Sequence, residues 1–272
     1  MSNEHPIIPV VVAGCNGRMG KVLMRMVSES DDFMLAGALE HENSPVLGAP
    51  AKEVEEHASE SVTVQSDPAA VFNSDRIVID FTRPEATREF LNEALNTETK
   101  LVIGTTGLSQ DDFRLLEEVS EQTSIVQAPN MSVGINLLLD LIDQTTKCLG
   151  DDFDVEILEM HHRHKEDAPS GTADLLADRV ARARHDQLKN VKKIGREGFE
   201  GERPPEEIGI SSVRGGDVVG DHTVMFAGEG ERIELTHKAS SRQTFARGAL
   251  RAARFLEGES RGLFSMKEVL GL

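Results

Sequence analysis

The sequence predicts an α/β protein of two domains, and three observations lead to this prediction. In the first half of the chain, apolar runs of strand length alternate with amphipathic helical segments. A glycine-rich turn directly follows the first of these runs. Residues 208–237 hold three strand-like segments without helices between them. We therefore expect a parallel sheet covered by helices, joined to a smaller α+β domain with an open mixed sheet.

The first strand and helix have the pattern of a Rossmann-type dinucleotide site. An apolar, β-branched run at residues 7–13 leads into Gly-Cys-Asn-Gly-Arg-Met-Gly at 14–20, and a helical apolar face follows. We expect Gly14 to allow a tight turn, Gly17 to let the backbone approach a pyrophosphate, and Gly20 to let the helix pack closely on the sheet. Asparagine replaces the second glycine of the commoner fingerprint, so the strand–turn–helix context supports the prediction more than the motif does.

The end of the second expected strand, residues 34–39, indicates which cofactor is bound. Glu40 follows that strand, 20 residues beyond Gly20, where an acid can accept both hydroxyls of the adenosine ribose. Such an acid disfavours a 2′-phosphate unless a cation stands beside it, and the neighbour here is His41. We expect NADH to be used at least as readily as NADPH. An ordinary loop carboxylate is the alternative for Glu40.

Further segments continue the alternation after a polar region at residues 42–68, which we expect to be a loop with one short helix. The expected strands lie at 76–81, 101–103 and 124–127, and the expected helices at 84–96 and 110–121. Ser109 and Asp112 resemble a capping box before the second helix. Turns Gly104-Thr105-Thr106-Gly107 and Ala128-Pro129-Asn130-Met131 follow two strand ends, which in a parallel sheet line the cofactor crevice. Plain turn chemistry is the alternative.

The richest stretch in ionisable groups is Glu-Met-His-His-Arg-His-Lys-Glu-Asp-Ala-Pro-Ser-Gly-Thr-Ala at 159–173. It follows a strand-like segment at 153–158, and Ser170 is a good N-cap for a helix. The amides of Gly171 and Thr172 then lie at the positive end of the helix dipole, which suits a carboxylate or phosphate. Histidine can exchange a proton near neutral pH, so the stretch is consistent with a proton donor within an anion clamp.

The residue types alone leave two other interpretations of this stretch open. One is a solvated basic turn without chemistry. The other is a metal site formed by Glu159, His161 and His164, although the adjacent lysine and arginine disfavour a cation and the HExxH pattern is absent.

The last part of the chain defines the second domain. A long helix is expected at 132–149, a Gly-, Glu- and Pro-rich loop at 195–207, strands at 208–214, 218–226 and 231–237, and a final helix at 243–257. The apolar face of the final helix, which includes Phe245, is expected to pack on the first domain. We therefore predict a dinucleotide-binding domain of residues 1–131 with 243–272, and a substrate-binding and tetramerisation domain of residues 132–242.

Composition excludes several classes of protein. The net charge of −18, with no Trp and no Tyr, provides neither a basic stripe nor stacking surface for nucleic acid. No apolar run reaches membrane-spanning length and no leader pattern precedes the first strand, so we expect a cytosolic protein. Cys15 and Cys148 have no pairing or metal spacing, and we expect both to be buried and reduced, and neither to be a nucleophile.

Taken in order, these motifs resemble the 4-hydroxy-tetrahydrodipicolinate reductase family, long called dihydrodipicolinate reductase, of bacterial diaminopimelate and lysine biosynthesis. The matching stretches span nearly the whole chain and comprise residues 14–20, Asp80-Phe81-Thr82-Arg83-Pro84, residues 104–107, residues 159–172 and His237-Lys238-Ala239-Ser240-Ser241-Arg242. The histidine-rich stretch is the most specific of them.

The resemblance implies an NAD(P)H-dependent oxidoreductase that reduces a cyclic dicarboxylate and assembles as a homotetramer. It implies that His161 is the proton donor and acceptor, that Lys165 is a second donor, and that His162, Gly171 and Thr172 hold substrate. The cofactor residues that it implies are Gly14, Cys15, Asn16, Gly17, Arg18, Met19, Glu40, Gly104, Thr105, Thr106, Ala128, Pro129, Asn130 and Met131, and no metal is expected.

One position departs from the family pattern. His41 stands where many relatives have arginine after the ribose-binding acid, and an imidazole binds a 2′-phosphate less well than a guanidinium does. We expect use of both cofactors with a bias toward NADH. The alternatives are another Rossmann-type reductase of a small dicarboxylate, a non-catalytic NADH-binding regulator and a metal-dependent hydrolase.

Overall fold

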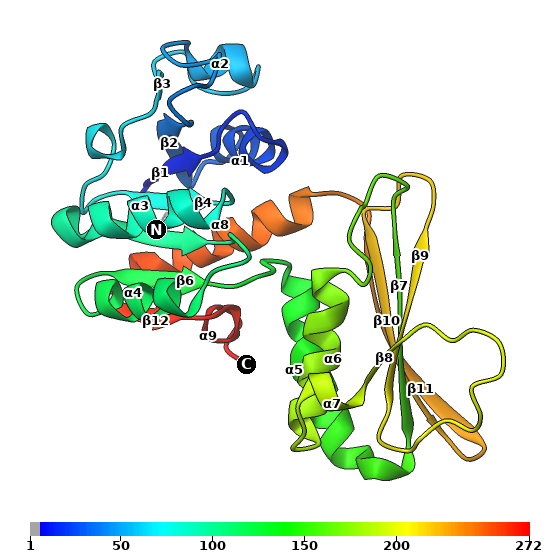
Figure 1. Cartoon of the computed structure of the whole chain (residues 1–272). Coiled ribbons are helices and arrows are strands. Elements are labelled where there is room, and N and C mark those ends of the chain that lie inside the picture. Colours follow the sequence, from blue (N-terminus) through cyan, green and yellow to red (C-terminus); the bar gives the residue numbers. More distant parts are fainter. Residues whose placement is uncertain (1–5) are drawn as a thin grey trace, which may run out of the picture. The chain divides into compact units, whose positions relative to one another are not determined.

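The computed structural model describes residues 6–272 and divides into two compact units (Figure 1). The first unit runs to Val133 and includes Gln243–Leu272, and the second comprises Gly134–Arg242. The boundary therefore lies two residues after the predicted one, and the C-terminal helix belongs to the first unit. Among the residues that the structure describes, every helix is too short or too polar to span a membrane.

Unit 1 holds a sheet of seven strands in the order β12-β6-β5-β4-β1-β2-β3, and every pairing in it is parallel. The strands are β1 (Ile8–Ala13), β2 (Phe33–Leu39), β3 (Val64–Gln65), β4 (Ile77–Asp80), β5 (Lys100–Ile103), β6 (Ser124–Gln127) and β12 (Gly262–Phe264). The helices are α1 (Arg18–Ser28), α2 (Ala51–Val54), η1 (Pro68–Ala70), α3 (Pro84–Thr97), α4 (Gln110–Ser120), α8 (Gln243–Glu257) and α9 (Met266–Leu270).

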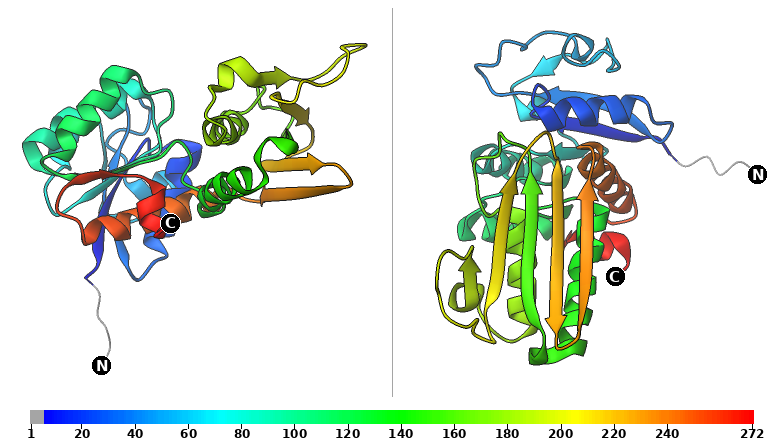
Figure 2. Two further views of the ribbon diagram at one scale, coloured as in Figure 1. Left: turned by 90° about the horizontal axis from the view of Figure 1, so that it is seen from below. Right: turned by 90° about the vertical axis from the view of Figure 1, so that its right-hand side faces the viewer.

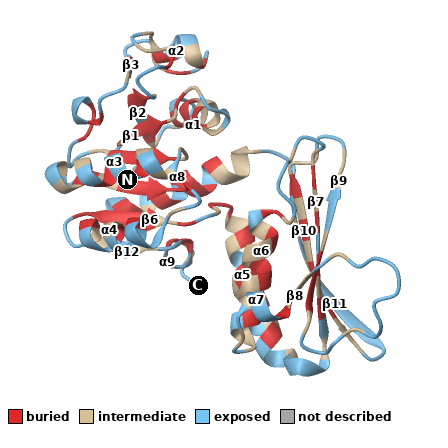
Figure 3. Cartoon of the chain, in the orientation of Figure 1, coloured by how far each residue is buried: buried red, intermediate tan, exposed pale blue. Residues whose placement is uncertain are grey.

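Strand β1 lies inside the sheet and is buried on both faces, as expected for a parallel sheet covered by helices (Figure 3). Val10 and Val12 join the apolar cluster that includes α1 and α8, whereas Val11 joins the cluster that includes α3 and α4. Because the strand order reverses at β1, a crevice is expected at the carboxyl ends of β1 and β4. This edge of the sheet carries the cofactor residues that the sequence predicts.

Unit 2 holds a mixed sheet of five strands in the order β11-β10-β7-β9-β8. Its strands are β7 (Asp154–His161), β8 (Lys192–Ile194), β9 (Ile208–Arg214), β10 (Gly220–Gly228) and β11 (Glu231–Ala239), and its helices are α5 (Val133–Leu149), η2 (Gly150–Asp152), α6 (Gly171–Ala183) and α7 (Leu188–Val191). Strands β7, β8 and β9 are parallel to one another, whereas β10 is antiparallel to β7 and β11.

Helices α5 and α6 cover one face of this sheet (Figure 1). Inward-facing residues of β7 alternate with exposed or half-buried ones, so Val155 and Ile157 pack under the helices and Leu158 faces away. Figure 2 (right) shows the opposite face of this sheet from the front. In the described part of the chain, no helix of this unit covers that face. Leu158 and Val213 are exposed on that face.

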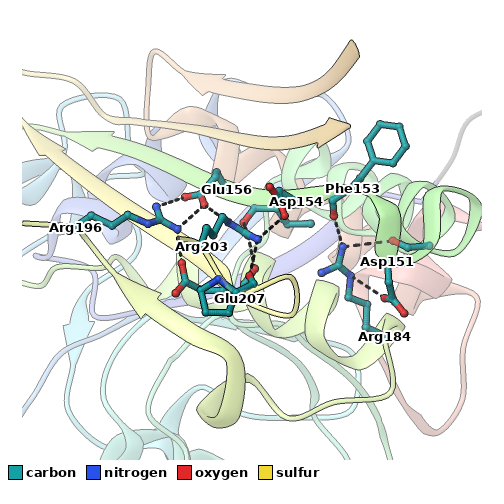
Figure 4. Close-up of polar contacts among 11 residues, drawn as sticks. Asp151, Phe153, Asp154, Glu156, Arg184, Arg196, Arg203 and Glu207 are labelled. Atoms are coloured by element: carbon teal, nitrogen blue, oxygen red, sulfur yellow. Dashed lines mark hydrogen bonds and ion pairs between the residues drawn. The ribbon is translucent and has the colours of Figure 1, made fainter. Parts of the chain in front are cut away.

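The loop 195–207 is held at one end of the open face by a set of ion pairs (Figure 4). Arg196 and Arg203 both bind the Glu156 carboxylate, at 2.8 and 3.0 Å, and Arg203 also binds Asp154 at 2.6 Å. Several charge-assisted hydrogen bonds to one carboxylate order a loop better than isolated surface pairs do. The predicted loop is therefore irregular but anchored.

Most expected elements are present, and the differences have local causes. Strands β3, β8 and β12 have two or three residues each, too few to give a periodic pattern, and the sequence prediction missed them. Strand β7 continues to His161, beyond the expected end at 158. The predicted burial of Cys148 is wrong: it is exposed because it lies off the buried stripe of α5 that ends at Thr146. Phe245 is only partly buried, because Ala246, Ala249 and neighbouring residues form the inner face of α8.

Candidate active site

The glycine turn between β1 and α1 is compact in the way that its spacing predicts. Gly14 has a φ of 65°, and its carbonyl accepts a hydrogen bond from the Gly17 amide at 2.9 Å. A Cβ at Gly20 would lie 2.2 Å from the Gly14 oxygen, so only glycine lets α1 approach the turn this closely. No side chain caps the start of α1 at Gly17, and the first-turn amides of this 11-residue helix suit a phosphate.

Glu40 lies at the end of β2, with its carboxylate directed at the glycine turn. One oxygen accepts the Asn16 amide at 3.0 Å and the other accepts the His41 amide at 3.1 Å. The His41 ring is 67% exposed, and its Nε2 lies 3.7 Å from the Glu40 carboxylate. The carboxylate and imidazole that the sequence singles out are therefore adjacent. Cys15 is buried in the same turn, and burial together with the nearby Glu40 charge raises the pKa of its thiol to about 12, which excludes a thiolate nucleophile.

Asp80, which the sequence analysis named only as part of a matching stretch, is a buried carboxylate that helps to connect the turn after β4 to the predicted cofactor turn at residues 104–107. Asp80, at the end of β4, accepts the Thr82 amide at 2.9 Å and the Thr87 hydroxyl at 2.5 Å. The Thr82 amide also lies 3.0 Å from the Thr105 hydroxyl, which belongs to the Gly-Thr-Thr-Gly turn. Burial raises the pKa of Asp80, and these hydrogen bonds oppose that shift.

The turn after β6 is held in a similar way. The Ala128 amide donates to the Ile103 carbonyl at 3.1 Å, and the Asn130 side chain accepts the Ser132 amide at 2.9 Å. A Cβ at Gly248 of α8 would lie 1.7 Å from the Met131 oxygen, so α8 packs directly on this turn. The predicted cofactor residues of unit 1 therefore all follow strand ends at one edge of one parallel sheet.

In unit 2, His161 is the last residue of β7 and is 8% exposed. Its Nδ1 lies 2.6 Å from Oε2 of Glu159, two residues earlier on the same face of the strand. Arg214, the last residue of β9, binds both oxygens of Glu159 at 2.7 and 2.8 Å. The Ser170 amide donates to the same carboxylate at 3.2 Å. Glu159 therefore joins the histidine to the start of α6.

The protonation states in this cluster follow from burial and hydrogen bonding. Burial alone would raise the pKa of Glu159, but hydrogen bonds from Arg214, Ser212 and His161 hold it at about 2. Burial lowers the pKa of His161 below its ordinary value, and the nearby Glu159 carboxylate opposes this effect. Glu159 is therefore a carboxylate at neutral pH, and the pKa of the His161 imidazole lies below its ordinary value.

Ser170 and His222 form the second part of the cluster. The Ser170 hydroxyl accepts the Ala173 amide at 3.1 Å, which confirms the predicted N-cap, and it lies 3.2 Å from Nε2 of His222. The His222 ring, on β10, meets the His161 ring edge-on with centroids 5.1 Å apart. Burial, and next the proximity of His161, lower the pKa of His222 to about 4, so this imidazole is neutral at neutral pH.

The remaining predicted substrate residues lie in the turn that follows β7 and at the start of α6. The Lys165 ammonium pairs with Asp167 at 2.8 Å, and the His162 and His164 rings lie 6.2 Å apart. Gly171 is exposed and begins α6 directly after Ser170. The structure therefore joins His161 to the N-terminus of α6 through Glu159 and Ser170.

The metal alternative receives no support from this geometry. Glu159, His161 and His164 do not come together as a ligand set; within residues 6–272 the one group with suitable spacing is Glu55, Glu56 and His57. That group is bound by Arg25, whose guanidinium lies 2.9 Å from Glu55 and disfavours a cation.

The sequence analysis missed Arg214 and His222, and a signal for both was present. In β9, Ile208 and Ile210 point under the helices, and the same alternation brings Arg214 to that face. In β10, Val224 and Phe226 point inward, and so does His222. A charged or titratable residue at an inward-facing strand position is the pattern that could have revealed them.

Comparison with known proteins identifies the family. Residues 8–131 match the sequence model described as dihydrodipicolinate reductase, N-terminus, and residues 134–270 match the one described as dihydrodipicolinate reductase, C-terminus. The chain belongs to the dihydrodipicolinate reductase family. It is 49% identical over 263 residues to the 4-hydroxy-tetrahydrodipicolinate reductase of Polynucleobacter necessarius, covering 97% of this chain and 98% of that protein. It is 47% identical over 263 residues to the enzyme of the same name from Nitrosomonas europaea, with the same coverage.

Solved structures agree with this family. A dipicolinate-bound dihydrodipicolinate reductase from Paenisporosarcina sp. TG-14 superposes with a TM-score of 0.76 at 26% identity, covering 96% of this chain and 98% of that one. A myo-inositol dehydrogenase from Corynebacterium glutamicum superposes with a TM-score of 0.55 at 12% identity, covering 94% and 90% of the two chains, and this likeness concerns the fold alone.

Proposed function

We propose that this member of the dihydrodipicolinate reductase family reduces 4-hydroxy-tetrahydrodipicolinate, with loss of water, to tetrahydrodipicolinate, using NADH or NADPH. The reaction belongs to diaminopimelate and lysine biosynthesis, and we place it in the cytoplasm. The observation that carries the proposal is the buried Glu159–His161 pair joined through Ser170 to the N-terminus of α6. It provides a proton donor next to a site for a carboxylate, as a cyclic dicarboxylate requires.

The residues of unit 1 fit a dinucleotide. The turn from Gly14 to Met19 presents uncapped α1 amides to a pyrophosphate, and the glycines leave the space that a Cβ would fill. The Glu40 carboxylate keeps lone pairs for the ribose hydroxyls while it holds the glycine turn. We assign Gly104 to Thr106 and Ala128 to Met131 to the cofactor as well, because both turns follow strand ends at the same edge of the sheet.

Loss of the 4-hydroxyl group as water leaves a conjugated dihydropyridine, and the nicotinamide, when bound, would supply a hydride to C4 of that ring. The chain must then protonate the electron-rich C3 that results, and we assign this step to His161. Lys165, His162 and the amides of Gly171 and Thr172 hold the substrate carboxylates and the developing charge. Replacing His161 with Gln should lower kcat by about hundredfold or more, with an unchanged NADH Kd. Equal losses in kcat and in cofactor affinity would contradict this role.

We also propose a homotetramer built on the open face of the unit 2 sheet. Leu158, Met160, Val213 and Met225 lie on that face, and Leu158 and Val213 are 42% and 48% exposed. Apolar side chains on an uncovered sheet face favour burial against another copy. Light scattering should give the mass of a tetramer for the wild type and a smaller mass for Leu158→Lys; a monomeric wild type would contradict the assembly.

The activity is tested by NADH and NADPH oxidation at 340 nm with freshly made 4-hydroxy-tetrahydrodipicolinate. The substrate is generated in the cuvette from pyruvate and aspartate semialdehyde by the preceding synthase. We expect oxidation that depends on both precursors and on the protein, with NADH at least as effective as NADPH. Binding of both cofactors without oxidation of either would instead support a non-catalytic regulator.

A further inference from the structure

Glu159 is placed unlike any other carboxylate in unit 2. It is 2% exposed and lies on the face of β7 that the helices cover, whereas Glu156 lies on the opposite face of the same strand. Its four partners come from three segments: His161 on its own strand, Arg214 and Ser212 on β9, and the Ser170 amide before α6. Enclosing a charge so fully is costly unless each of its lone pairs is used.

The His161 imidazole contacts this carboxylate through one particular ring nitrogen. Nδ1 lies 2.6 Å from Oε2 of Glu159, and because Glu159 is ionised, Nδ1 must carry the hydrogen in this bond. The other ring nitrogen, Nε2, lies above the backbone of Gly220 on β10, where a Cβ would come within 2.9 Å. The ring orientation is therefore determined from both sides.

We propose that Glu159 is a positioning residue for the reaction: it keeps the proton on Nδ1 of His161, so that Nε2 is the atom that protonates the substrate, and Arg214 holds Glu159 in place. The inference rests on the proposed function. In the step itself the Nε2–H bond breaks and a C3–H bond forms, leaving a neutral imidazole with its hydrogen on Nδ1. A proton from solvent then restores the imidazolium.

The charges around His161 explain why a carboxylate is needed. The groups that face its ring are Glu159 from β7, Lys165 from the following turn, Arg214 from β9 and His222 from β10. Burial and the two cations disfavour the imidazolium, and Glu159 is the member of this set that favours it. Without the carboxylate, nothing in this set would oppose burial and the two cations, and the pKa of His161 would fall further.

The test compares Glu159→Gln with Glu156→Gln. Glu156 is a matched control, since it lies three residues earlier on β7, on the opposite face of the strand, and arginines hold it as well: Arg196 and Arg203 bind its carboxylate (Figure 4). In the wild type we expect kcat to fall as the pH rises through the pKa of His161. In Glu159→Gln we expect this fall to move to lower pH by at least about one unit, with an unchanged NADH Kd, and no movement in Glu156→Gln.

A second readout does not require activity. NMR titration of the His161 ring should show a pKa lower by the same amount in Glu159→Gln and a loss of the Nδ1–H tautomer, while Glu159→Asp should stay closer to the wild type. A lower kcat with an unmoved pH profile and an unmoved His161 titration would overturn the inference and leave Glu159 a structural role. If the wild type oxidised neither NADH nor NADPH in the presence of substrate, the proposed function would be wrong instead. The NMR titration would still test whether Glu159 controls the protonation of His161.

Discussion

Replacing His222 with Gln should make the protein more resistant to acid. Burial, with the nearby His161, lowers the pKa of His222 from 6.5 to about 4, so between these values the unfolded chain binds a proton that the folded chain excludes. Above pH 6.5 neither state is protonated and the side chain has no effect on pH dependence. As the pH falls from 6.5 toward 4, each pH unit lowers the free energy of unfolding by about 1.4 kcal/mol. The total loss due to His222 is about 2 kcal/mol at pH 5 and about 3 kcal/mol at pH 4.

The measurement is urea unfolding followed by circular dichroism at pH 7.5 and pH 5, because the chain has no Trp or Tyr to report by fluorescence. Gln keeps a nitrogen close to the position of Nε2 and can still bind the Ser170 hydroxyl. Burial also lowers the pKa of His161 and of His237, so the wild type should lose more than His222 alone explains. The difference between wild type and variant isolates His222.

We expect the loss of unfolding free energy between these two pH values to be smaller in His222→Gln by about 2 kcal/mol. The exposed His185 of the same unit, replaced by Asn, is the matched control and should leave the difference unchanged. Equal pH dependences in wild type and His222→Gln would refute the reasoning, since His222 would then titrate alike in the folded and unfolded chain.

Three further predictions concern backbone space and cofactor choice. Gly20→Ala places a Cβ 2.2 Å from the Gly14 oxygen and should destabilise unit 1 by about 1–3 kcal/mol and weaken NADH binding; an unchanged Tm would show that the turn can relax. Gly220→Ala places a Cβ 2.9 Å from Nε2 of His161 and should lower kcat by about tenfold with NADH Kd unchanged, whereas wild-type turnover would argue against a fixed ring. His41→Arg should raise the ratio of kcat/KM for NADPH to that for NADH by about tenfold, and an equal ratio would show that position 41 does not set the preference.

The fold of unit 1 could be predicted because its signals are local. The glycine turn and the predicted capping box of Ser109 and Asp112 depend on residues within one or two helical turns of each other, and both are present. Strands β3 and β12 could not be predicted, because two or three residues have no period and their place is decided by the neighbouring strand.

The site of unit 2 was predicted only where it is continuous in sequence. His161 and Ser170 belong to one stretch, and both lie in the cluster that the structure shows. Arg214 and His222 join it through the register of β9 and β10 against β7, which pairs His161 with Arg214 and Glu159 with His222. The alternation along each strand marks both side chains as inward-facing, but the register that brings them to Glu159 and His161 depends on packing of the whole sheet.

The most direct measurement for the proposed reaction follows the hydride. NADH deuterated at both C4 positions is supplied with 4-hydroxy-tetrahydrodipicolinate, and the product is analysed by mass spectrometry and NMR. We predict tetrahydrodipicolinate with one deuterium at C4, and a second at C3 when the reaction is run in D2O. Consumption of NADH with an unlabelled product would contradict direct hydride transfer to this substrate.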